Sequence, residues 1–418
     1  MFHKKLQIYY RLFISLFFLS NLNAQNKIEF DYSSINNEEF FWIQNNNYGF
    51  INSDNLLNIS IKNKVGNINY LISLSNGYSG NESFTFGETF IDYHINKNIY
   101  LIGGKYYRKF SLYLNDRLSS GSLLISNNAR PIPRIGIGGN KKLPMNEKVE
   151  FDWGISHGFL KKTRFYSDAP YLHEKFVYLK SSFKSRVKFG VGFVHTAIWA
   201  GTTIDTIHNN NPGDQPDSLK NFLKVFIAAD GPLLGNEPHA NALGSHNGIW
   251  DFYIESNFNT NKLKFYYQHY FEDTSSLRFA NKTDGLWGIE LNDELNNNIF
   301  LIEFLNTTNC CLDPPYQNDI YYWNYQYNDG WRYKDLTIGN PFINRDKMIE
   351  KSKIVHIGLV QNFYNNSISL KVSKKINVND ILRYKIEYEK NFGNFLGKLI
   401  LVGNEYSSSF GFGAAYSF

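Results

Sequence analysis

The chain has 418 residues, of which 17 % are aromatic, and a formal net charge of +5 that falls to +2 without the three basic residues of an N-terminal signal. This near-neutral balance gives no support for a nucleic-acid partner. The mean hydropathy is −0.38 and no later apolar run is long enough for a transmembrane helix, which excludes a helical membrane protein but not a membrane β-barrel.

Residues 1–24 are typical of a secretory signal peptide. Lys4, Lys5 and Arg11 form its positive region, residues 12–19 its apolar core, and residues 22–24 a cleavage site of small character. The apolar core is too short to span a membrane. We therefore expect residues 25–39 to be a short periplasmic N-terminal segment and residues 40–418 to form the main domain.

Many later segments alternate apolar with polar or small residues, which is the period of a β-strand with two different faces. In residues 148–156, large side chains fall at every second position: Val149, Phe151, Trp153 and Ile155. Residues 67–75, 186–195, 250–258 and 262–271 repeat the pattern. A large soluble β-sandwich also alternates in this way. The secretory signal and the single long domain favour an outer-membrane barrel instead.

The last ten residues, 409–418, show the same alternation most clearly. Phe410, Phe412, Tyr416 and Phe418 fall on one face of an extended strand, and glycine, alanine and serine fall on the other. A final strand with one aromatic face is typical of bacterial outer-membrane barrels, whose lipid-facing surface is apolar.

Strand starts are expected near residues 40, 56, 66, 83, 98, 131, 147, 172, 186, 249, 262, 285, 297, 353, 366, 383, 395 and 409. The fold class is therefore all-β, a transmembrane antiparallel barrel of about 18 strands, an even number as in single-chain bacterial barrels. Short polar turns mark the periplasmic side, and long extracellular loops are expected over 110–130, 158–171, 196–248 and 307–352. Within the third loop, apolar residues at helical spacing predict a short helix over 219–229, capped by Asp217 or Ser218.

The loops and the expected lumen suggest a binding function. Inward positions carry both signs of charge, which favours a charge-paired, partly closed interior over a wide general porin. Aromatic rings beside polar groups suit sugar rings, and arginine suits sugar carboxylates. The candidate polysaccharide-binding residues are Arg130, Arg134, Trp323, Trp331, Arg332 and Tyr333. For any one of them, packing of the loop over the lumen is the favoured interpretation, and the sugar-binding hypothesis applies to the set as a whole.

Other chemistry finds little support. Residues 136–139 are glycine-rich but lack the helix and acidic partner of a nucleotide site. No nucleophile elbow or ordered Ser/His/Asp set marks a hydrolase, so we expect no catalytic residues and no enzyme activity. Cys310 and Cys311 are adjacent, which disfavours a disulfide between them, and His239 and His246 lack a metal-binding spacing. No metal or cofactor is expected.

Several short motifs, in this order, give the chain a resemblance to the Wzi capsule assembly family of outer-membrane proteins. They lie at 40–43, 47–49, 126–133, 154–158, 173–175, 242–246, 284–288, 303–307, 330–333 and 339–342. The resemblance implies an eighteen-stranded barrel that binds exported polysaccharide as a lectin, anchors capsule and is not an enzyme. The best-known members carry a helical bundle before the barrel, for which residues 25–39 leave little room.

The sequence thus predicts a protein of the Gram-negative outer membrane that contacts membrane lipid and capsular or other surface polysaccharide, with polysaccharide export proteins as further partners. A carbohydrate-selective porin or uptake channel is the alternative, and an outer-membrane hydrolase is a third hypothesis.

Overall fold

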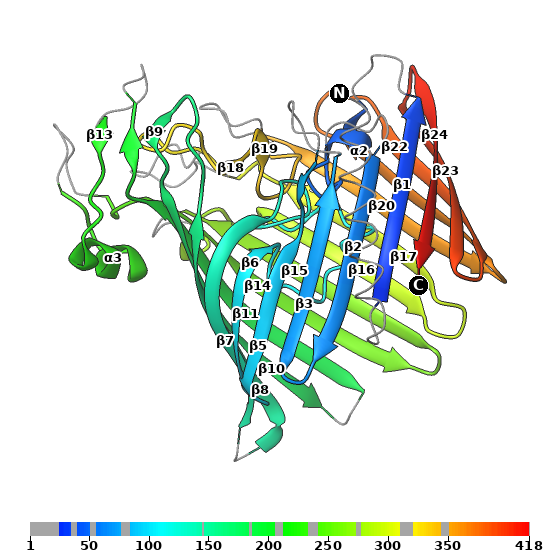
Figure 1. The fold of residues 1–418 in the computed structure, drawn as a ribbon, viewed down its shortest axis with the longest axis horizontal. Helices are drawn as coiled ribbons and strands as arrows, with labels where there is room; N and C mark the ends of the chain where they lie inside the picture. The colour runs from blue at the N-terminus through cyan, green and yellow to red at the C-terminus, as the bar shows by residue number, and fades with distance from the viewer. Residues whose placement is uncertain are drawn as a thin grey trace, which may run out of the picture.

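The computed structural model describes residues 25–34, 40–50, 56–76, 84–143, 146–183, 186–204, 212–232, 241–272, 277–309, 321–343 and 351–417. The predicted signal peptide, both cysteines, His239 and Phe418 lie outside these ranges. One large antiparallel sheet dominates the described residues and curls around an interior (Figure 1).

The alternating segments form the strands of this sheet. Their bounds are β1 (Gln25–Ser34), β2 (Leu56–Val65), β3 (Ile68–Ser75), β4 (Thr85–Phe86), β5 (Thr89–Asn96), β6 (Ile99–Tyr106), β7 (Ile132–Leu143), β8 (Asn146–Phe159), β10 (Tyr171–Phe183), β11 (Val187–Trp199), β14 (Ser245–Phe258), β15 (Asn261–Phe271), β16 (Gly285–Asp293), β17 (Asn298–Asn306), β20 (Lys353–Phe363), β21 (Asn366–Lys375), β22 (Arg383–Phe392), β23 (Phe395–Asn404) and β24 (Ser408–Ser417).

Each strand of the large sheet pairs antiparallel with its neighbours in chain order, from the β2–β3 hairpin to the β23–β24 hairpin. The first strand β1 pairs with β2 on one side and with the last strand β24 on the other. The short β4 and the longer β5 both pair with β3 and so share one position in the 19-stranded sheet. The prediction of an antiparallel barrel of about 18 strands is confirmed.

The outward face of the sheet is apolar, as β24 illustrates. Phe410, Phe412 and Tyr416 are exposed on it, whereas Gly411 and Gly413 are buried on the inward face. Exposed rings and aliphatic chains in the same alternation cover neighbouring strands. In a transmembrane barrel this face meets lipid, which explains why so many large apolar side chains lie outside the core.

The two ends of the barrel differ (Figure 1). Tight turns such as 66–67, 97–98 and 393–394 join strands at one end, the periplasmic side. The described parts of the long connections lie at the other, extracellular end. They carry β9 (Tyr166–Asp168), β12 (Thr202–Thr203), β13 (Gly213–Asp214), β18 (Arg332–Tyr333), β19 (Leu336–Thr337) and the helix α3 (Leu219–Phe226). The predicted helix is confirmed, and the Ser218 hydroxyl caps it by accepting from the Asn221 amide.

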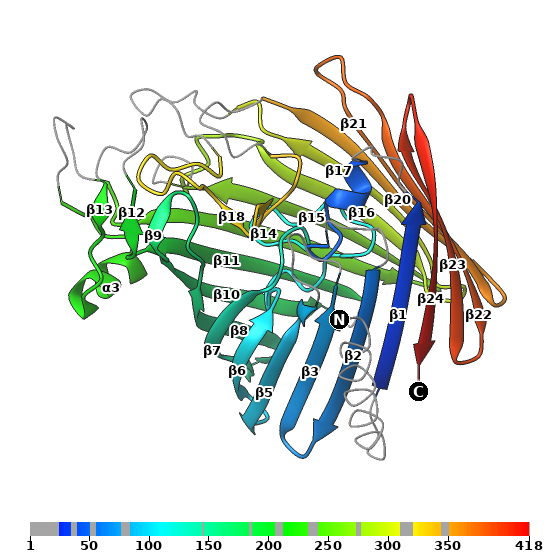
Figure 2. The same ribbon diagram turned by 45° about the horizontal axis from the view of Figure 1, so that its top comes forward.

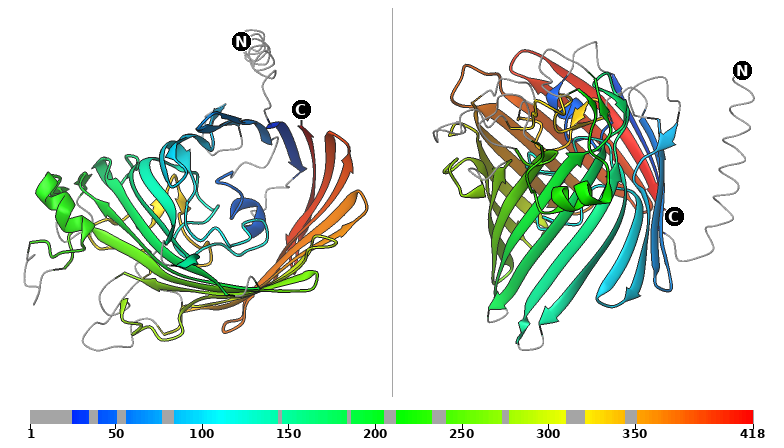
Figure 3. Two further views of the ribbon diagram at one scale, coloured as in Figure 1. Left: turned by 90° about the horizontal axis from the view of Figure 1, so that it is seen from below. Right: turned by 90° about the vertical axis from the view of Figure 1, so that its left-hand side faces the viewer.

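The prediction for the start of the barrel is wrong. The sequence predicts a first strand near residue 40 after a periplasmic segment over 25–39. Instead β1 occupies residues 25–34 and pairs along β24. The apolar run at 40–43 starts the short helix α2 (Phe41–Gln44), which buries Trp42 and Ile43 inside the ring (Figure 3). Among the described residues, none of the helices has the length and hydrophobicity needed to cross a bilayer.

Charges on the inward face are paired, as the sequence predicts. The ion pairs join Lys264 to Glu290 (2.8 Å), Lys262 to Glu255 (2.9 Å) and Lys385 to Glu387 (2.8 Å). Because each lysine faces a carboxylate, these stretches of the lumen wall present no field of one sign to a passing ion.

Candidate functional site

Three loop segments fold inward at the extracellular end and fill the mouth of the barrel. They comprise residues 40–50, 107–131 and 321–343, and we call them together the lumenal plug. Figure 2 shows the segment with β18 and the connection after β6 lying within the ring of strands. Most side chains of 118–132 are buried, although this stretch contains no long strand or helix. A loop this long is typically functional when it is ordered.

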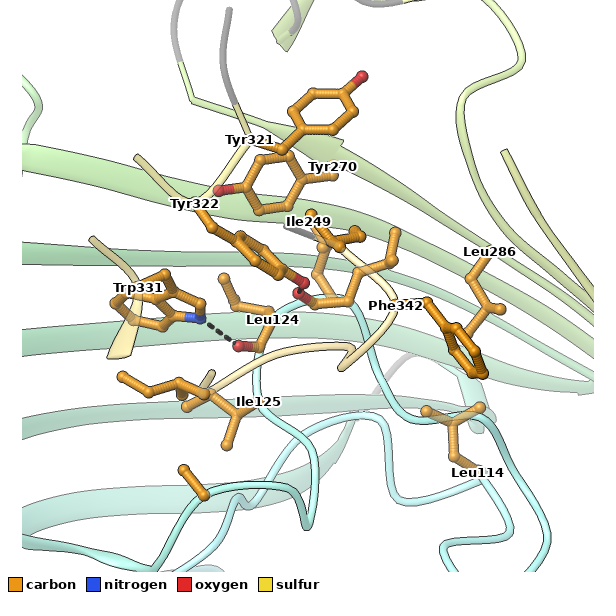
Figure 4. Packing of buried hydrophobic residues seen from close by; sticks show 14 of the residues in the cluster. Leu114, Leu124, Ile125, Ile249, Tyr270, Leu286, Tyr321, Tyr322, Trp331 and Phe342 are labelled. Atoms are coloured by element: carbon orange, nitrogen blue, oxygen red, sulfur yellow. Dashed lines mark hydrogen bonds between the residues drawn. The ribbon is translucent and has the colours of Figure 1, made fainter. Parts of the chain in front are cut away.

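The second and third segments of the lumenal plug are joined by hydrogen bonds from side chains to backbone. These bonds run from Trp331 Nε1 to the Leu124 carbonyl (2.6 Å), from Ser126 Oγ to the Gly339 carbonyl (2.7 Å), and from Asn340 Nδ2 to the Gly121 carbonyl (2.7 Å). Figure 4 shows the first of them within the cluster of buried apolar side chains. Buried loop backbone needs such partners, because an unpaired polar group away from water is costly.

The first segment packs on the other two. The Trp42 ring lies edge-on to Phe342, with centroids 5.8 Å apart, and the Asn46 amide donates to Asn128 Oδ1 (2.9 Å). Gly49 has φ +77° and lies so close to Arg130 that a Cβ there would meet its backbone nitrogen at 2.6 Å. Only glycine combines this backbone conformation with this close approach.

Two carboxylates on the lumen wall hold the plug. Glu303 on β17 accepts from Ser119 Oγ (2.6 Å), from the Ser120 amide (2.6 Å) and from the Tyr266 hydroxyl (2.5 Å). The glutamate side chain is almost completely buried. Hydrogen bonds to an ionised carboxylate are short and stronger than neutral ones, so this residue ties 119–120 to the wall.

Asp251 on β14 makes a second anchor. It accepts from Ser111 Oγ (2.5 Å) and Tyr113 Oη of the plug, and from Tyr178 Oη of the wall (2.5 Å). Burial raises the pKa of Tyr113 well above its usual value, and the nearby Asp251 charge adds to the shift. Tyr113 therefore stays protonated and keeps donating at any physiological pH.

The structure buries four of the six predicted binding residues. Arg134 on β7 pairs with Glu174 of β10 (2.5 Å) and lies over the Tyr106 ring at 4.2 Å, with 1 % of its surface exposed. Arg130, Trp331 and Tyr333 are also buried. Arg130, Trp331 and Tyr333 pack within the plug, Arg134 pairs within the wall, and a ligand outside the barrel does not reach any of the four.

The other two predicted residues are more accessible. Trp323 is half-buried at the mouth. Arg332 adjoins Trp331 and Tyr333 in sequence and donates to Asp335 Oδ1 (3.1 Å). The structure brings Arg130 and Arg134 together, because both line a small cavity with Ile338 of the third plug segment. A role for any of the six in binding stays a prediction.

A cleft of about 260 Å³ opens at the mouth between α2 and the wall. Its lining includes Phe41, Gln44 and Asn45 from the first plug segment and Arg383 and Asn404 from β22 and β23. The Phe41 ring stacks on Phe342 of the third segment, with centroids 4.4 Å apart. The sequence pattern does not predict this site, because the apolar run at 40–43 indicates a strand there and the structure has a helix.

The Arg383 guanidinium lies 5.4 Å from the Phe41 ring centre and forms a fork onto Asp380 (2.6 and 3.0 Å). Burial alone would raise the pKa of Asp380. The hydrogen bonds and the charge of Arg383 together have the larger, opposite effect, so the pKa of Asp380 lies below its usual value. The fork thus persists at neutral pH and is lost only in acid, below the ordinary aspartate range. It holds the arginine in place beside the ring. An aromatic face, amides and a fixed guanidinium together suit a hydroxyl-rich or acidic ring.

A family model for the capsule assembly protein Wzi matches residues 19–376. The chain belongs to the Wzi capsule assembly family. This membership confirms the resemblance drawn from the sequence motifs. No curated protein sequence matches the chain.

Solved structures agree with the fold of the Wzi family. The Wzi outer-membrane protein of Escherichia coli, involved in group 1 capsule assembly and described as a carbohydrate-binding β-barrel, matches with a TM-score of 0.61 at 13 % identity, over 96 % of this chain and 85 % of that one. A porin of Rhodopseudomonas blastica (TM-score 0.39, 8 % identity, 95 % and 99 % covered) and OmpT of Vibrio cholerae (0.39, 8 %, 95 % and 98 %) also match. The protein is an outer-membrane barrel, as predicted.

Proposed function

We propose that this Wzi-family barrel binds exported polysaccharide at the cell surface and supports capsule assembly and attachment. Family membership over most of the chain carries the proposal. The mouth of the barrel supports it, because ordered loops there enclose a cleft large enough for a sugar ring. We further propose that the protein is a lectin without catalytic activity and that polysaccharide export proteins act beside it.

The lumenal plug favours binding over transport. An uptake channel needs a continuous aqueous path, whereas the described loops fill the extracellular end with buried side chains held by wall carboxylates. The alternative of a carbohydrate-selective porin is correspondingly weaker.

The cleft is the place where we expect a sugar unit to dock. One face of the Phe41 ring would stack on the ring, while Gln44, Asn404 and Arg383 offer donors to hydroxyl or carboxylate oxygens. The preformed Phe41–Phe342 stack lowers the entropy cost of binding, since the aromatic face is already oriented.

Phe41→Ala and Arg383→Ala are expected to weaken polysaccharide binding about tenfold each, a loss of about 1.4 kcal/mol per variant. Binding would be measured by calorimetry on the folded protein in detergent, with surface polysaccharide from the producing cells and dextran as a neutral comparison. Tyr406→Ala is the matched control, because this exposed ring lies at the same end of the barrel but outside the cleft.

Two results would count against these ideas in different ways. Equal binding by all variants would move the site away from the cleft, and Trp323 and Arg332 would be tested next. No binding by the unaltered protein, together with unchanged cell-bound capsule after gene deletion, would overturn the function itself.

A further inference from the structure

The helix α3 lies outside the barrel wall, at the extracellular end of β10 and β11 (Figures 1 and 3). Its Phe222 ring contacts the rings of Trp199 and His173, both with centroids 5.3 Å apart. Val225 is completely buried in the cluster that contains Trp199. Phe226 packs on His173 at 5.2 Å. One side of the helix is therefore fixed to the outward face of the barrel.

A second side of α3 is apolar and uncovered. Leu219, Leu223 and Ile227 are exposed by 76, 57 and 69 %, respectively. They recur every four residues along the helix and its C-cap, so they form one row. At about 100° per residue, this row adjoins the docked side, and Lys220 and Lys224 occupy the remaining side. The helix thus presents three faces: wall, free apolar row and basic polar side.

The height of α3 on the barrel matches the edge of the membrane. A strand tilted by about 40° climbs roughly 2.5 Å per residue, so a hydrocarbon band of about 25 Å spans about ten residues. Counted from Val187 beside the periplasmic turn, the band on β11 ends near Ala197. The helix contacts Trp199 of β11 and Lys175 of β10, and Lys175 lies opposite His195 in the sheet. It therefore lies at the extracellular limit of the band.

The free row of α3 continues the surface that already faces lipid. On the periplasmic side of the helix, the outward side chains Leu179, Phe189 and Val191 are exposed by 50, 43 and 40 %. Because α3 packs on His173, Lys175 and Trp199 of the same two strands, its row of leucine and isoleucine adds to the apolar side chains on this outward face. Contact with lipid would remove these three large side chains from water, which is favourable in proportion to the apolar area that they bury.

The charges near the helix fit an anionic membrane surface. Residues 219–226 include Lys220 and Lys224 and no acidic residue, and Lys175 lies below with its ammonium 4.3 Å from the Phe226 ring centre. Lys224 Nζ also donates to the Asp230 carbonyl (3.0 Å). Asp217 and Asp230 flank the helix at its ends. Lipid headgroups of the outer leaflet carry phosphates, which suit this basic side.

We propose that α3 is an interfacial helix that inserts Leu219, Leu223 and Ile227 into the outer leaflet, with its lysines at lipid phosphates. The insertion anchors the long 200–244 connection to the membrane surface beside the mouth. It is a lipid contact separate from polysaccharide binding in the cleft.

The test uses a nitroxide spin label on the full chain, with Cys310 and Cys311 replaced by serine. Leu223→Cys places the label on the free row, and Lys220→Cys places it on the basic side as the matched control. The protein is reconstituted in vesicles of phosphatidylethanolamine and phosphatidylglycerol. Collisions with oxygen, which is enriched in lipid, are compared with collisions with a water-soluble nickel complex.

The label at position 223 is expected to favour oxygen over nickel severalfold more than the label at position 220. Replacing phosphatidylglycerol by zwitterionic phosphatidylcholine should reduce this difference, because the membrane surface then loses the net negative charge that attracts the lysines. Equal nickel access at both positions would overturn the proposal. Exclusion of both reagents at 223, with dipolar broadening between labels on different molecules, would also overturn it, since a second copy of the chain would then cover the row.

Discussion

Asp251→Ala and Glu303→Ala, introduced together, are expected to turn a silent barrel into a conducting one. Each carboxylate accepts three hydrogen bonds, and both tie the 107–131 segment of the plug to the wall. A hydrogen bond to a charged group is worth about 1.5–3 kcal/mol, and its loss also leaves buried donors unsatisfied. The double variant should therefore release part of the plug. A barrel of this size without a plug contains an aqueous channel.

Single-channel recording in planar bilayers measures this effect. The unaltered protein should show no stable conductance, and the double variant should show frequent opening steps. Asp152→Ala is the matched control, because Asp152 is a wall carboxylate that pairs with Lys180 and not with the plug. Heat-shifted migration on gels verifies that each barrel is folded. A folded but silent double variant would show that other contacts hold the plug, and steady conductance of the unaltered protein would restore the channel hypothesis.

The sequence alone predicts the wall of this barrel well, because a strand between lipid and lumen must alternate at every second residue. Starts near 285, 353, 366, 383 and 395 coincide with those of β16, β20, β21, β22 and β23. The helical spacing in 219–226 was equally readable. These features are local, and each is decided by neighbours in the chain.

The start of the barrel differs from the prediction for a physical reason. Residues 27–32 alternate charged with apolar residues, which is typical of a strand. The denser apolar run at 40–43 is also compatible with a strand, and it is the segment that the sequence analysis predicts as the first one. A continuous run does not distinguish a strand from a buried helix. Burial of Trp42 against Phe342 and His356, far away in sequence, decides the helix.

The candidate site was the least predictable part. The sequence predicts that Trp331 and Tyr333 bind sugar rings. Aromatic residues in a long polar loop are, however, equally suited to packing inside a plug. Long-range contacts decide between these roles: the Trp331 indole bonds to Leu124, and Phe41 meets Phe342 across the mouth. Neither contact can be predicted from the residues next to it in the sequence, because its two partners are far apart in the chain. The cleft beside Arg383 is lined by residues from 40–45, 381–383 and 403–404, and no single sequence motif predicts it.

Arg134 offers the sharpest contrast between a structural and a ligand-binding role. Its guanidinium pairs with Glu174 and donates to the Tyr106 carbonyl, and both charged side chains are at most 3 % exposed. Arg134→Ala leaves the Glu174 carboxylate buried with Ser156 as its remaining side-chain donor. Removing one partner of a buried ion pair costs about 3–5 kcal/mol. We expect a large drop in the denaturant midpoint of the barrel in detergent.

The companion variant separates charge from packing. Arg134→Met with Glu174→Met removes both charges and keeps much of the apolar volume, so it should recover most of the lost stability, because the buried charge is no longer unpaired. Lys180→Ala, which breaks a more exposed ion pair on the same wall, should cost less. If Arg134→Ala instead kept its stability and lost polysaccharide binding, the arginine would be a ligand residue. Since a buried carboxylate requires its partner whether or not sugar is present, the stability loss should appear in the ligand-free protein.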